Sequence, residues 1–173
     1  MVQVGIDVVR IERFSRLSNG WGPFYRRVYT TTEQTAFGKD PVLLALCLTA
    51  KEAVAKVLGT GLSLGAGPEV ACTELEITCA LGGQYPSVRL SGSAMKIRDE
   101  LRLSRIVLVW YHDLDCAFSI AAAGDAGLEQ QLTCALKATL CSLIKRVAAS
   151  SRKRGTPHVG PYGNKAAVEK CDR

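Results

Sequence analysis

The sequence predicts a mixed α+β domain of about 124 residues, followed by a further helix and a basic tail. Three patterns lead to this prediction: an alternating apolar segment at the N-terminus, a long capped helical segment at 40–59, and two apolar runs at 106–110 and 116–123. The chain has 173 residues, of which 47% are hydrophobic and 22% charged. This size and composition are typical of one globular domain and exclude wholesale disorder.

The N-terminal segment predicts a strand followed by a helix. Apolar residues alternate with Gln3, Gly5 and Asp7, which is the period of a strand. From residue 11 the apolar positions recur at helical spacing, and Gly20 breaks this helix. Further on, Thr30 followed by Glu33 has the spacing of a capping box and predicts the start of another short helix.

The clearest element is a helix between Asp40 and Gly59. Asp40 is a favourable N-cap, Pro41 suits the first helical position, and Gly59 provides a left-handed end. The glycine-rich segment 59–68 that follows lacks the Gly-Lys-Ser/Thr ending of a nucleotide-binding loop and does not follow a strand. We therefore interpret this segment as an ordinary loop.

The second half of the chain alternates between strand and helix patterns. Strands are predicted at 73–79 and 87–90 with a turn at Gly82-Gly83, and a helix from Ser91 or Ser93 to about Leu103.

The two apolar runs then form a hairpin of buried strands, and a leucine stripe from 125 predicts a helix. We expect a domain at 1–124, a helical extension at 125–150 and a disordered tail at 151–173.

Charge and cysteine content narrow the classes of partner and compartment. Residues 1–144 carry equal numbers of basic and acidic side chains, so the formal net charge of +6 comes from residues 145–173. We therefore expect neither a nucleic acid nor a membrane as partner of the domain. Seven cysteines without a Cys-x-x-Cys pair, and only two histidines, favour reduced thiols over a zinc site or a disulfide framework. The absence of a signal-like N-terminus also favours a cytoplasmic protein.

Three side chains could carry chemistry. Asp7 stands on the polar side of the first predicted strand, and Glu52 and Lys56 are four residues apart and share one face of the predicted helix. By residue type and spacing alone, Asp7 could be a turn residue, and Glu52 with Lys56 could be a surface ion pair.

Three segments, in this order and spacing, resemble the holo-[acyl-carrier-protein] synthase family of small 4'-phosphopantetheinyl transferases. They are Gly5-Ile-Asp-Val-Val-Arg-Ile-Glu-Arg-Phe14, Phe24-Tyr-Arg-Arg-Val-Tyr-Thr-Thr-Thr-Glu33 and Leu48-Thr-Ala-Lys-Glu-Ala-Val-Ala-Lys-Val-Leu-Gly-Thr-Gly61. The resemblance extends more weakly to about Gly124. It implies a 4'-phosphopantetheinyl transferase-like fold: a small antiparallel sheet packed with helices, here with an additional C-terminal helix.

The resemblance implies a reaction and a set of site residues. The phosphopantetheine arm of coenzyme A is moved to a serine of an apo acyl carrier protein, with release of adenosine 3',5'-bisphosphate, as in fatty acid biosynthesis. Asp7 and Glu52 would bind Mg²⁺, which takes one or two carboxylates together with phosphate oxygens and water. Glu52 could accept the serine proton, and Lys56 would neutralise the diphosphate.

Further residues acquire implied roles from the same resemblance. Lys51, Lys56, His112, Gly59 and Gly61 would contact coenzyme A, and the enzyme would be a homotrimer with its active site between subunits. An arginine row would dock the acidic carrier protein. Its members are Arg10, Arg13, Arg16 and Arg27, with Arg26 nearby. Without the resemblance, Arg10 and Arg16 are equally compatible with a solvated face.

The chain departs from the family pattern at several positions. Val109 and Tyr111 replace small hydroxyl residues before His112, Cys47 stands where many relatives have an arginine, and Gln84 replaces a glycine. These departures leave an alternative open, namely a catalytically weakened homologue that acts as a binding module for coenzyme A or carrier proteins. Nucleic-acid binding through the basic tail is a third, weaker hypothesis.

Overall fold

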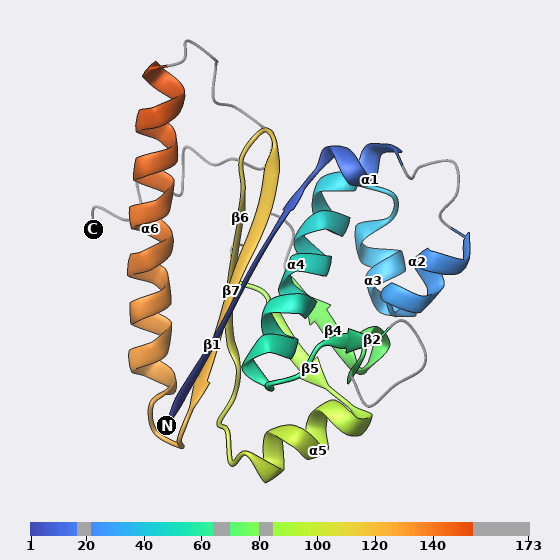
Figure 1. Ribbon diagram of the computed structural model, residues 1–173, viewed down its shortest axis with the longest axis vertical. Helices are drawn as coiled ribbons and strands as arrows, with labels where there is room; N and C mark the ends of the chain where they lie inside the picture. The colour runs from blue at the N-terminus through green and yellow to red at the C-terminus, as the bar shows by residue number, and fades with distance from the viewer. Residues whose placement is uncertain (17–21, 64–69, 80–84, 154–173) are drawn as a thin grey trace.

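A three-stranded antiparallel sheet forms the centre of the molecule (Figure 1). The computed structural model describes residues 1–16, 22–63, 70–79 and 85–153. Strand β1 (Val2–Arg10) pairs with β7 (Cys116–Gly124), and β7 pairs with β6 (Val107–His112), so the strand order is β1-β7-β6. The first strand of the chain is therefore joined to the last one, with Val2 opposite Gly124.

Two long helices cover opposite faces of this sheet (Figure 1). Helix α4 (Pro41–Val57) packs on all three strands, whereas α6 (Glu129–Lys153) packs on β6 and β7. Each face has its own apolar cluster: Leu108 and Trp110 of β6 belong to the α4 cluster, and Val109 and Tyr111 belong to the α6 cluster. The alternation of side chains along a strand explains this division.

Strand β1 turns its polar and small residues, not its apolar row, toward α4. Gly5 and Val9 are buried and Asp7 is half-buried, whereas Val4 and Ile6 are exposed. Beside β1, β7 contributes small buried residues such as Ala121, so α4 can lie close to the sheet. The alternating pattern thus predicts the strand correctly, while the side of the strand that is buried is set by the helix that covers it.

The ends of the helices follow the predicted capping. The Oδ1 of Asp40 accepts hydrogen bonds from the amides of Val42 and Leu43, and Pro41 occupies the first position of α4. Gly59, just after α4, has a φ of +72°, the left-handed conformation that glycine adopts without strain. The capping box of Thr30 and Glu33 at α3 (Thr31–Phe37) is present in full.

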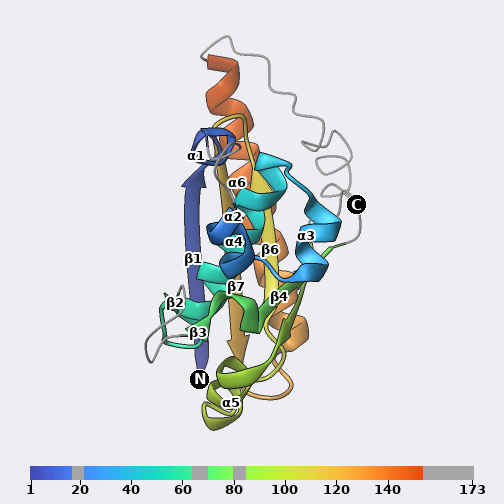
Figure 2. The ribbon, with the colours of Figure 1, turned by 90° about the vertical axis from the view of Figure 1, so that its right-hand side faces the viewer.

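The remaining elements surround α4 on the side away from the sheet and at its end (Figure 2). They are α1 (Glu12–Arg16), α2 (Gly22–Val28), β2 (Leu62–Ser63), β3 (Val70–Ala71), the 3-10 helix η2 (Cys72–Glu74), β4 (Leu75–Thr78), β5 (Ser87–Leu90) and α5 (Gly92–Glu100). Strands β2 and β3 form a parallel pair, and β4 and β5 an antiparallel one.

Several predicted boundaries need correction. The strand predicted at 73–79 begins only at Leu75, because Cys72–Glu74 form a 3-10 turn. Helix α5 ends at Glu100, and α6 runs from Glu129 to Lys153, past the predicted limit at residue 150. The parallel β2–β3 pair at the glycine-rich segment had no sequence signal. The predicted turn at Gly82-Gly83 and Gln84 lie outside the described residues.

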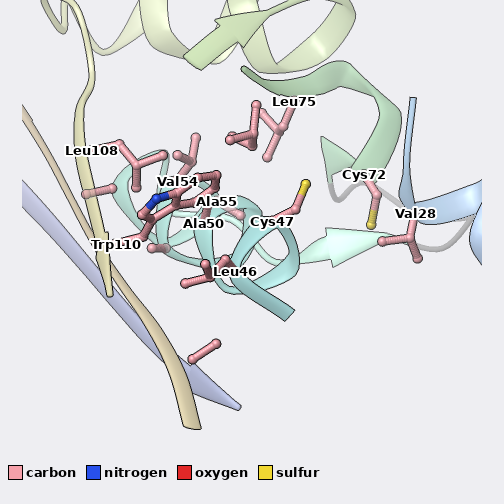
Figure 3. Packing of buried hydrophobic residues seen from close by; sticks show 14 of the residues in the cluster. Val28, Leu46, Cys47, Ala50, Val54, Ala55, Cys72, Leu75, Leu108 and Trp110 are labelled. Carbon is pink, nitrogen blue, oxygen red and sulfur yellow. The ribbon is translucent and has the colours of Figure 1, made fainter. Parts of the chain in front are cut away.

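The core lies mainly around α4 (Figure 3). Figure 3 shows Leu108 and Trp110 on the sheet side of this helix and Val28 and Cys72 on the other. Among the described residues, five cysteines are free thiols, whereas Cys141 of α6 is in a disulfide. No helix in the described part of the chain combines the length and hydropathy that crossing a membrane requires.

Candidate active site

The candidate site lies where β1 crosses α4, and Gly5 makes this crossing possible. A Cβ atom at residue 5 would lie 2.0 Å from the carbonyl oxygen of Ala53 and 2.9 Å from the Cβ of Lys56. Any larger residue would push the helix away from the strand. The glycine of the Gly-Ile-Asp segment therefore sets the distance between the strand that carries Asp7 and the helix that carries Glu52 and Lys56.

Asp7 and Lys56 form an ion pair across this crossing. The Lys56 ammonium donates to the Oδ1 of Asp7 and to the carbonyl oxygen of Ile6, at 2.8 Å each. The Asp7 side chain is 24% exposed and that of Lys56 46%. A pair this accessible adds little stability. The pair does show that the Asp7 carboxylate binds a positive charge presented by α4.

Glu52 is on the same side of α4. It is half-buried and lies one turn before Lys56 and one turn after Thr49. The hydroxyl of Thr49 lies 2.8 Å from that of Ser119, and Ser119 is the direct partner of Asp7 in the sheet. Of the two residues one turn from Glu52, Lys56 contacts Asp7 and Thr49 contacts Ser119, the sheet partner of Asp7. By helical spacing, Glu52 lies near the face of α4 that carries Lys56, the ion-pair partner of Asp7.

The donor set at this crossing fits magnesium better than zinc. No group of three or more His, Cys, Asp or Glu side chains able to hold a metal ion occurs in the described residues. Structural and catalytic zinc sites have three or four protein ligands, usually nitrogen or sulfur. Magnesium instead takes one or two carboxylates and completes its shell with water and phosphate oxygens. The carboxylates of Asp7 and Glu52, both on half-buried residues, would therefore suit this ion as a partial ligand set.

Lys51 does not reach this surface, which contradicts its predicted contact with coenzyme A. Its side chain is fully buried, and its ammonium contacts Glu33, the Val28 carbonyl and the Cys72 carbonyl at 2.7, 2.7 and 2.8 Å. An ammonium group has three N–H donors, so none remains for a phosphate. The periodicity of α4 contained a signal for this burial, because Lys51 follows Leu44 by seven residues and Leu48 by three.

His112 ends β6 next to the hairpin turn. Its Nδ1 lies 3.0 Å from the carbonyl oxygen of Asp113, while its buried Nε2 has no hydrogen-bond partner among the described residues. The residue is 8% exposed and its ring stacks on Tyr111. His112 pairs with Ala117, two residues along β7 from the partner of Asp7. It is thus in the same sheet as Asp7, and its buried Nε2 is not hydrogen-bonded by any described residue.

The two predicted glycines lie where α4 ends. The amide of Gly59 donates to the carbonyl of Lys56, and the amide of Thr60 donates to that of Ala55. These bonds close the last turn of the helix, directly after Lys56. Gly61 comes just before β2 and is half-buried. The two glycines therefore accompany Lys56 at one end of the site.

The predicted arginine row extends over three elements, β1, α1 and α2. Arg10 at the end of β1, Arg13 on α1, and Arg26 and Arg27 on α2 are exposed. Arg16 ends α1, and its side chain is not among those that the structure describes. Arg10 also lines a cleft of about 550 Å³ between the start of α1 and the tip of the β6–β7 hairpin, where Leu114 is exposed. The arginines thus form an accessible basic surface, not a buried cluster.

The departures from the family pattern are accounted for by packing. Val109 and Tyr111 are buried in the cluster beneath α6, together with Leu136, Leu140 and Ile144. Apolar residues at these two positions therefore match the extra helix that covers them. Cys47 is fully buried within the core, where burial and then the charge of Glu33 raise the pKa of its thiol well above the ordinary value.

The chain is similar to proteins of known family. The family model described as the 4'-phosphopantetheinyl transferase superfamily matches residues 3–91. The holo-[acyl-carrier-protein] synthase of Chlamydia muridarum is 35% identical over 127 residues, which are 71% of this chain and 94% of the relative. That of Roseiflexus castenholzii is 37% identical over 110 residues, which are 62% of this chain and 80% of the relative.

Solved structures show the same fold. The crystal structure of holo-[acyl-carrier-protein] synthase from Neisseria meningitidis has a TM-score of 0.61 and 29% identity, covering 72% of this chain and all of that one. The Helicobacter pylori enzyme in complex with coenzyme A has a TM-score of 0.57 and 21% identity, covering 70% of this chain and 99% of that one. The matched motifs, the fold and the curated relatives together show that the chain is a transferase of the holo-[acyl-carrier-protein] synthase family, within the 4'-phosphopantetheinyl transferase superfamily.

Proposed function

We propose that the protein transfers the 4'-phosphopantetheine arm of coenzyme A to a serine of an apo acyl carrier protein, with Mg²⁺ as cofactor and adenosine 3',5'-bisphosphate as the released product. The observation that carries the proposal is the crossing of β1 and α4, where the Lys56 ammonium contacts Asp7 and Glu52 shares its helix face. Relatives named holo-[acyl-carrier-protein] synthase, and a solved relative in complex with coenzyme A, support it.

The chemistry uses three side chains. Asp7 and Glu52 would hold the magnesium ion, which when bound neutralises the diphosphate of coenzyme A. The Lys56 ammonium would turn from Asp7 to the same diphosphate as a second positive charge. The serine oxygen forms a bond to the phosphorus that bears the pantetheine arm, and the bond from that phosphorus to the oxygen of the leaving adenosine bisphosphate breaks. Glu52 accepts the serine proton, directly or through water.

Other residues would bind the two substrates. His112 offers its unpartnered Nε2, and Gly59 and Gly61 offer backbone next to Lys56, for contacts with coenzyme A. The arginine row Arg10, Arg13, Arg16 and Arg27 would dock the carrier protein, because carrier proteins of this class are acidic and a basic surface speeds and orients their encounter. Arg10, Arg13 and Arg27 are exposed. Lys51 is not part of this set, because it is fully buried.

We further propose a homotrimer, as the family resemblance implies. Its support in this chain is the apolar row of β1: Val2, Val4, Ile6 and Val8 are 49–63% exposed on an edge strand that α6 leaves uncovered. Apolar side chains in such a row are typical of a surface that another protein chain covers.

We also propose that the protein acts in the cytoplasm and supplies holo carrier proteins for fatty acid biosynthesis. Five of the six described cysteines are free thiols, which supports a reducing compartment, whereas the disulfide of Cys141 departs from the reduced thiols that the sequence predicts.

The alternative, a weakened homologue that only binds coenzyme A or carriers, has lost the observation that motivated it. Val109, Tyr111 and Cys47 are accounted for by their burial. The ion pair of Asp7 and Lys56 is present, and Glu52 precedes Lys56 by one turn of α4. We therefore keep the transferase as the proposed function.

The test is a mass measurement on an apo carrier incubated with coenzyme A, Mg²⁺ and the protein. The carrier should gain the mass of one phosphopantetheine arm. Asp7→Asn and Glu52→Gln should each lower kcat/KM by about 10³-fold while the melting temperature stays near that of the unchanged protein. The exposed acids on α5 provide matched controls, Asp99→Asn and Glu100→Gln, which should leave the rate unchanged. Retained transfer in both site variants would exclude this metal site.

A further inference from the structure

A buried ion pair between Lys51 and Glu33 lies directly behind the candidate site. Both side chains are fully inaccessible to solvent, and the ammonium is 2.7 Å from the Oε2 of Glu33. Burying two charges is unfavourable unless each is paired and its remaining hydrogen bonds are made. Here the ammonium also donates to the carbonyls of Val28 and Cys72, so all of its N–H groups have acceptors.

Glu33 is also saturated with hydrogen bonds. Its Oε1 accepts from the amide of Ile77 at 2.7 Å, and its Oε2 accepts from the amide of Thr30 at 2.8 Å. The second bond is half of the capping box at the start of α3. A capping-box glutamate normally serves only its own helix. This one joins the start of α3 to β4 and to the ammonium on α4.

The partners of the pair come from α2, η2, β4 and the start of α3, on the side of α4 away from the sheet. Val28 is the last residue of α2, Cys72 begins η2, and Lys51 directly precedes Glu52 on α4. Figure 3 shows Val28 and Cys72 side by side, on the side of α4 opposite Trp110. The pair therefore links α2, which carries the exposed Arg26 and Arg27, to the helix turn that carries Glu52.

We infer that Lys51 and Glu33 are positioning residues that hold the arginine-bearing helix α2 at a fixed place relative to Glu52. The inference rests on the proposed function for the roles of Arg27 and Glu52. In this arrangement Lys51 acts through Val28 and Glu33 and does not touch coenzyme A. Its loss should impair use of the carrier and leave binding of coenzyme A intact.

The experiment compares three variants with the unchanged protein: Lys51→Met, Glu33→Gln and the double variant. Lys51→Met leaves a buried carboxylate without its cation, and Glu33→Gln leaves a buried ammonium without its anion. The double variant has no charge at these two positions, and its glutamine oxygen can still accept from one of the two amides. A pair that acts as a unit should therefore show strong coupling between the two substitutions.

Three measurements report on each variant. Hydrogen exchange should show lower protection in α2 and α3 in both single variants, with most of the protection regained in the double variant. The kcat/KM for the carrier should fall about tenfold or more in the single variants and recover to within about threefold in the double. The Kd of coenzyme A, measured by calorimetry, should stay within about twofold throughout.

Several outcomes would overturn the inference. A Kd of coenzyme A that weakens about tenfold in both Lys51 variants but not in Glu33→Gln would show that Lys51 contacts the coenzyme. Unchanged hydrogen exchange in α2 and α3 of the single variants would show that the pair does not hold these helices in place. A double variant whose exchange protection does not recover would show the same. If the single variants fail to fold, the double variant alone decides: it should fold and bind coenzyme A with unchanged Kd, and if it does not, the inference is wrong.

The proposed function and this inference fail in different ways. If the unchanged protein transfers no arm to any carrier, the proposed function is wrong. The exchange measurement needs neither carrier nor coenzyme, and it still decides whether the pair holds α2 against α4.

Discussion

Helices α4 and α6 pack on opposite faces of one sheet but are buried in different ways. Helix α4 is surrounded by the sheet, by α1 and by β4, and most of its residues are inaccessible. Helix α6 buries one stripe, Leu136, Leu140 and Ile144, with Leu132 and Leu143 partly buried beside it, and most other side chains described between 129 and 146 are exposed. Polar groups inside α4 must therefore be paired, as Lys51 and Thr49 are, whereas α6 needs only an apolar stripe. Precise geometry is concentrated on the face that carries the candidate site.

The largest effect is expected at Gly5, where the α4 face has no space. Gly5→Ala places a Cβ 2.0 Å from the Ala53 carbonyl oxygen, so the strand and helix must separate, and we expect a loss of about 3 kcal/mol or more of unfolding free energy. Chemical denaturation measures this loss. Gly22→Ala is the control, because a Cβ there meets nothing within 4 Å. Equal stability of the two variants would contradict the close crossing.

A substitution in the core of the α6 face should cost less stability. Leu140→Ala removes a fully buried side chain and should lower the unfolding free energy by about 2–3 kcal/mol, through lost burial and a residual cavity. Below its melting temperature the variant should transfer the arm at nearly the unchanged rate, because no candidate site residue belongs to this cluster. Gln131→Ala, on the exposed side of α6, is the stability control. A large loss of rate without a loss of stability would mean that α6 takes part in the reaction.

A smaller effect is expected from the hydroxyl pair between α4 and the sheet. The Thr49 hydroxyl donates to the Leu46 carbonyl at 3.0 Å, so the Ser119 hydroxyl, 2.8 Å away, is the donor to Thr49. Ser119→Ala should cost about 1 kcal/mol, the usual net value of one hydrogen bond, in a denaturation experiment. The double variant Thr49→Val with Ser119→Ala should be no less stable than Thr49→Val alone, because either substitution already breaks the bond. If the losses of the two single variants instead add up in the double variant, the bond is contradicted.

The two helices should also differ in thiol reactivity. Burial, followed by the charge of Glu33, raises the pKa of the Cys47 thiol on α4, whereas Cys134 on α6 is exposed. Because the thiolate is the reactive form, a raised pKa lowers the reactive fraction at pH 8. Iodoacetamide followed by peptide mass spectrometry should label Cys134 first and Cys47 only on unfolding. Early labelling at Cys47 would show that the α4 core opens readily.

The sequence was informative where one local pattern decides the structure. The caps of α4, the capping box of α3 and the strand β5 follow directly from residue types and spacing. Asp7, Glu52 and Lys56 stood out only when the resemblance to a family was added to their spacing.

What could not be predicted depends on contacts between distant segments. Glu33 was expected only as a cap, because nothing local in the sequence joins it to Lys51 or to Ile77. The exposed side of β1 likewise depends on α4 and α6, which come much later in the chain. The parallel β2–β3 pair is too short to leave a periodic signal.

The pairing of β1 with β7 has a consequence for synthesis on the ribosome. Strand β1 emerges first, yet its hydrogen-bonding partner ends at Gly124, so the sheet cannot close until almost the whole domain has left the exit tunnel. During that interval an apolar strand with unpaired amides is available to neighbouring nascent chains. The order of translation thus makes the N-terminal strand the segment that a chaperone would have to shield.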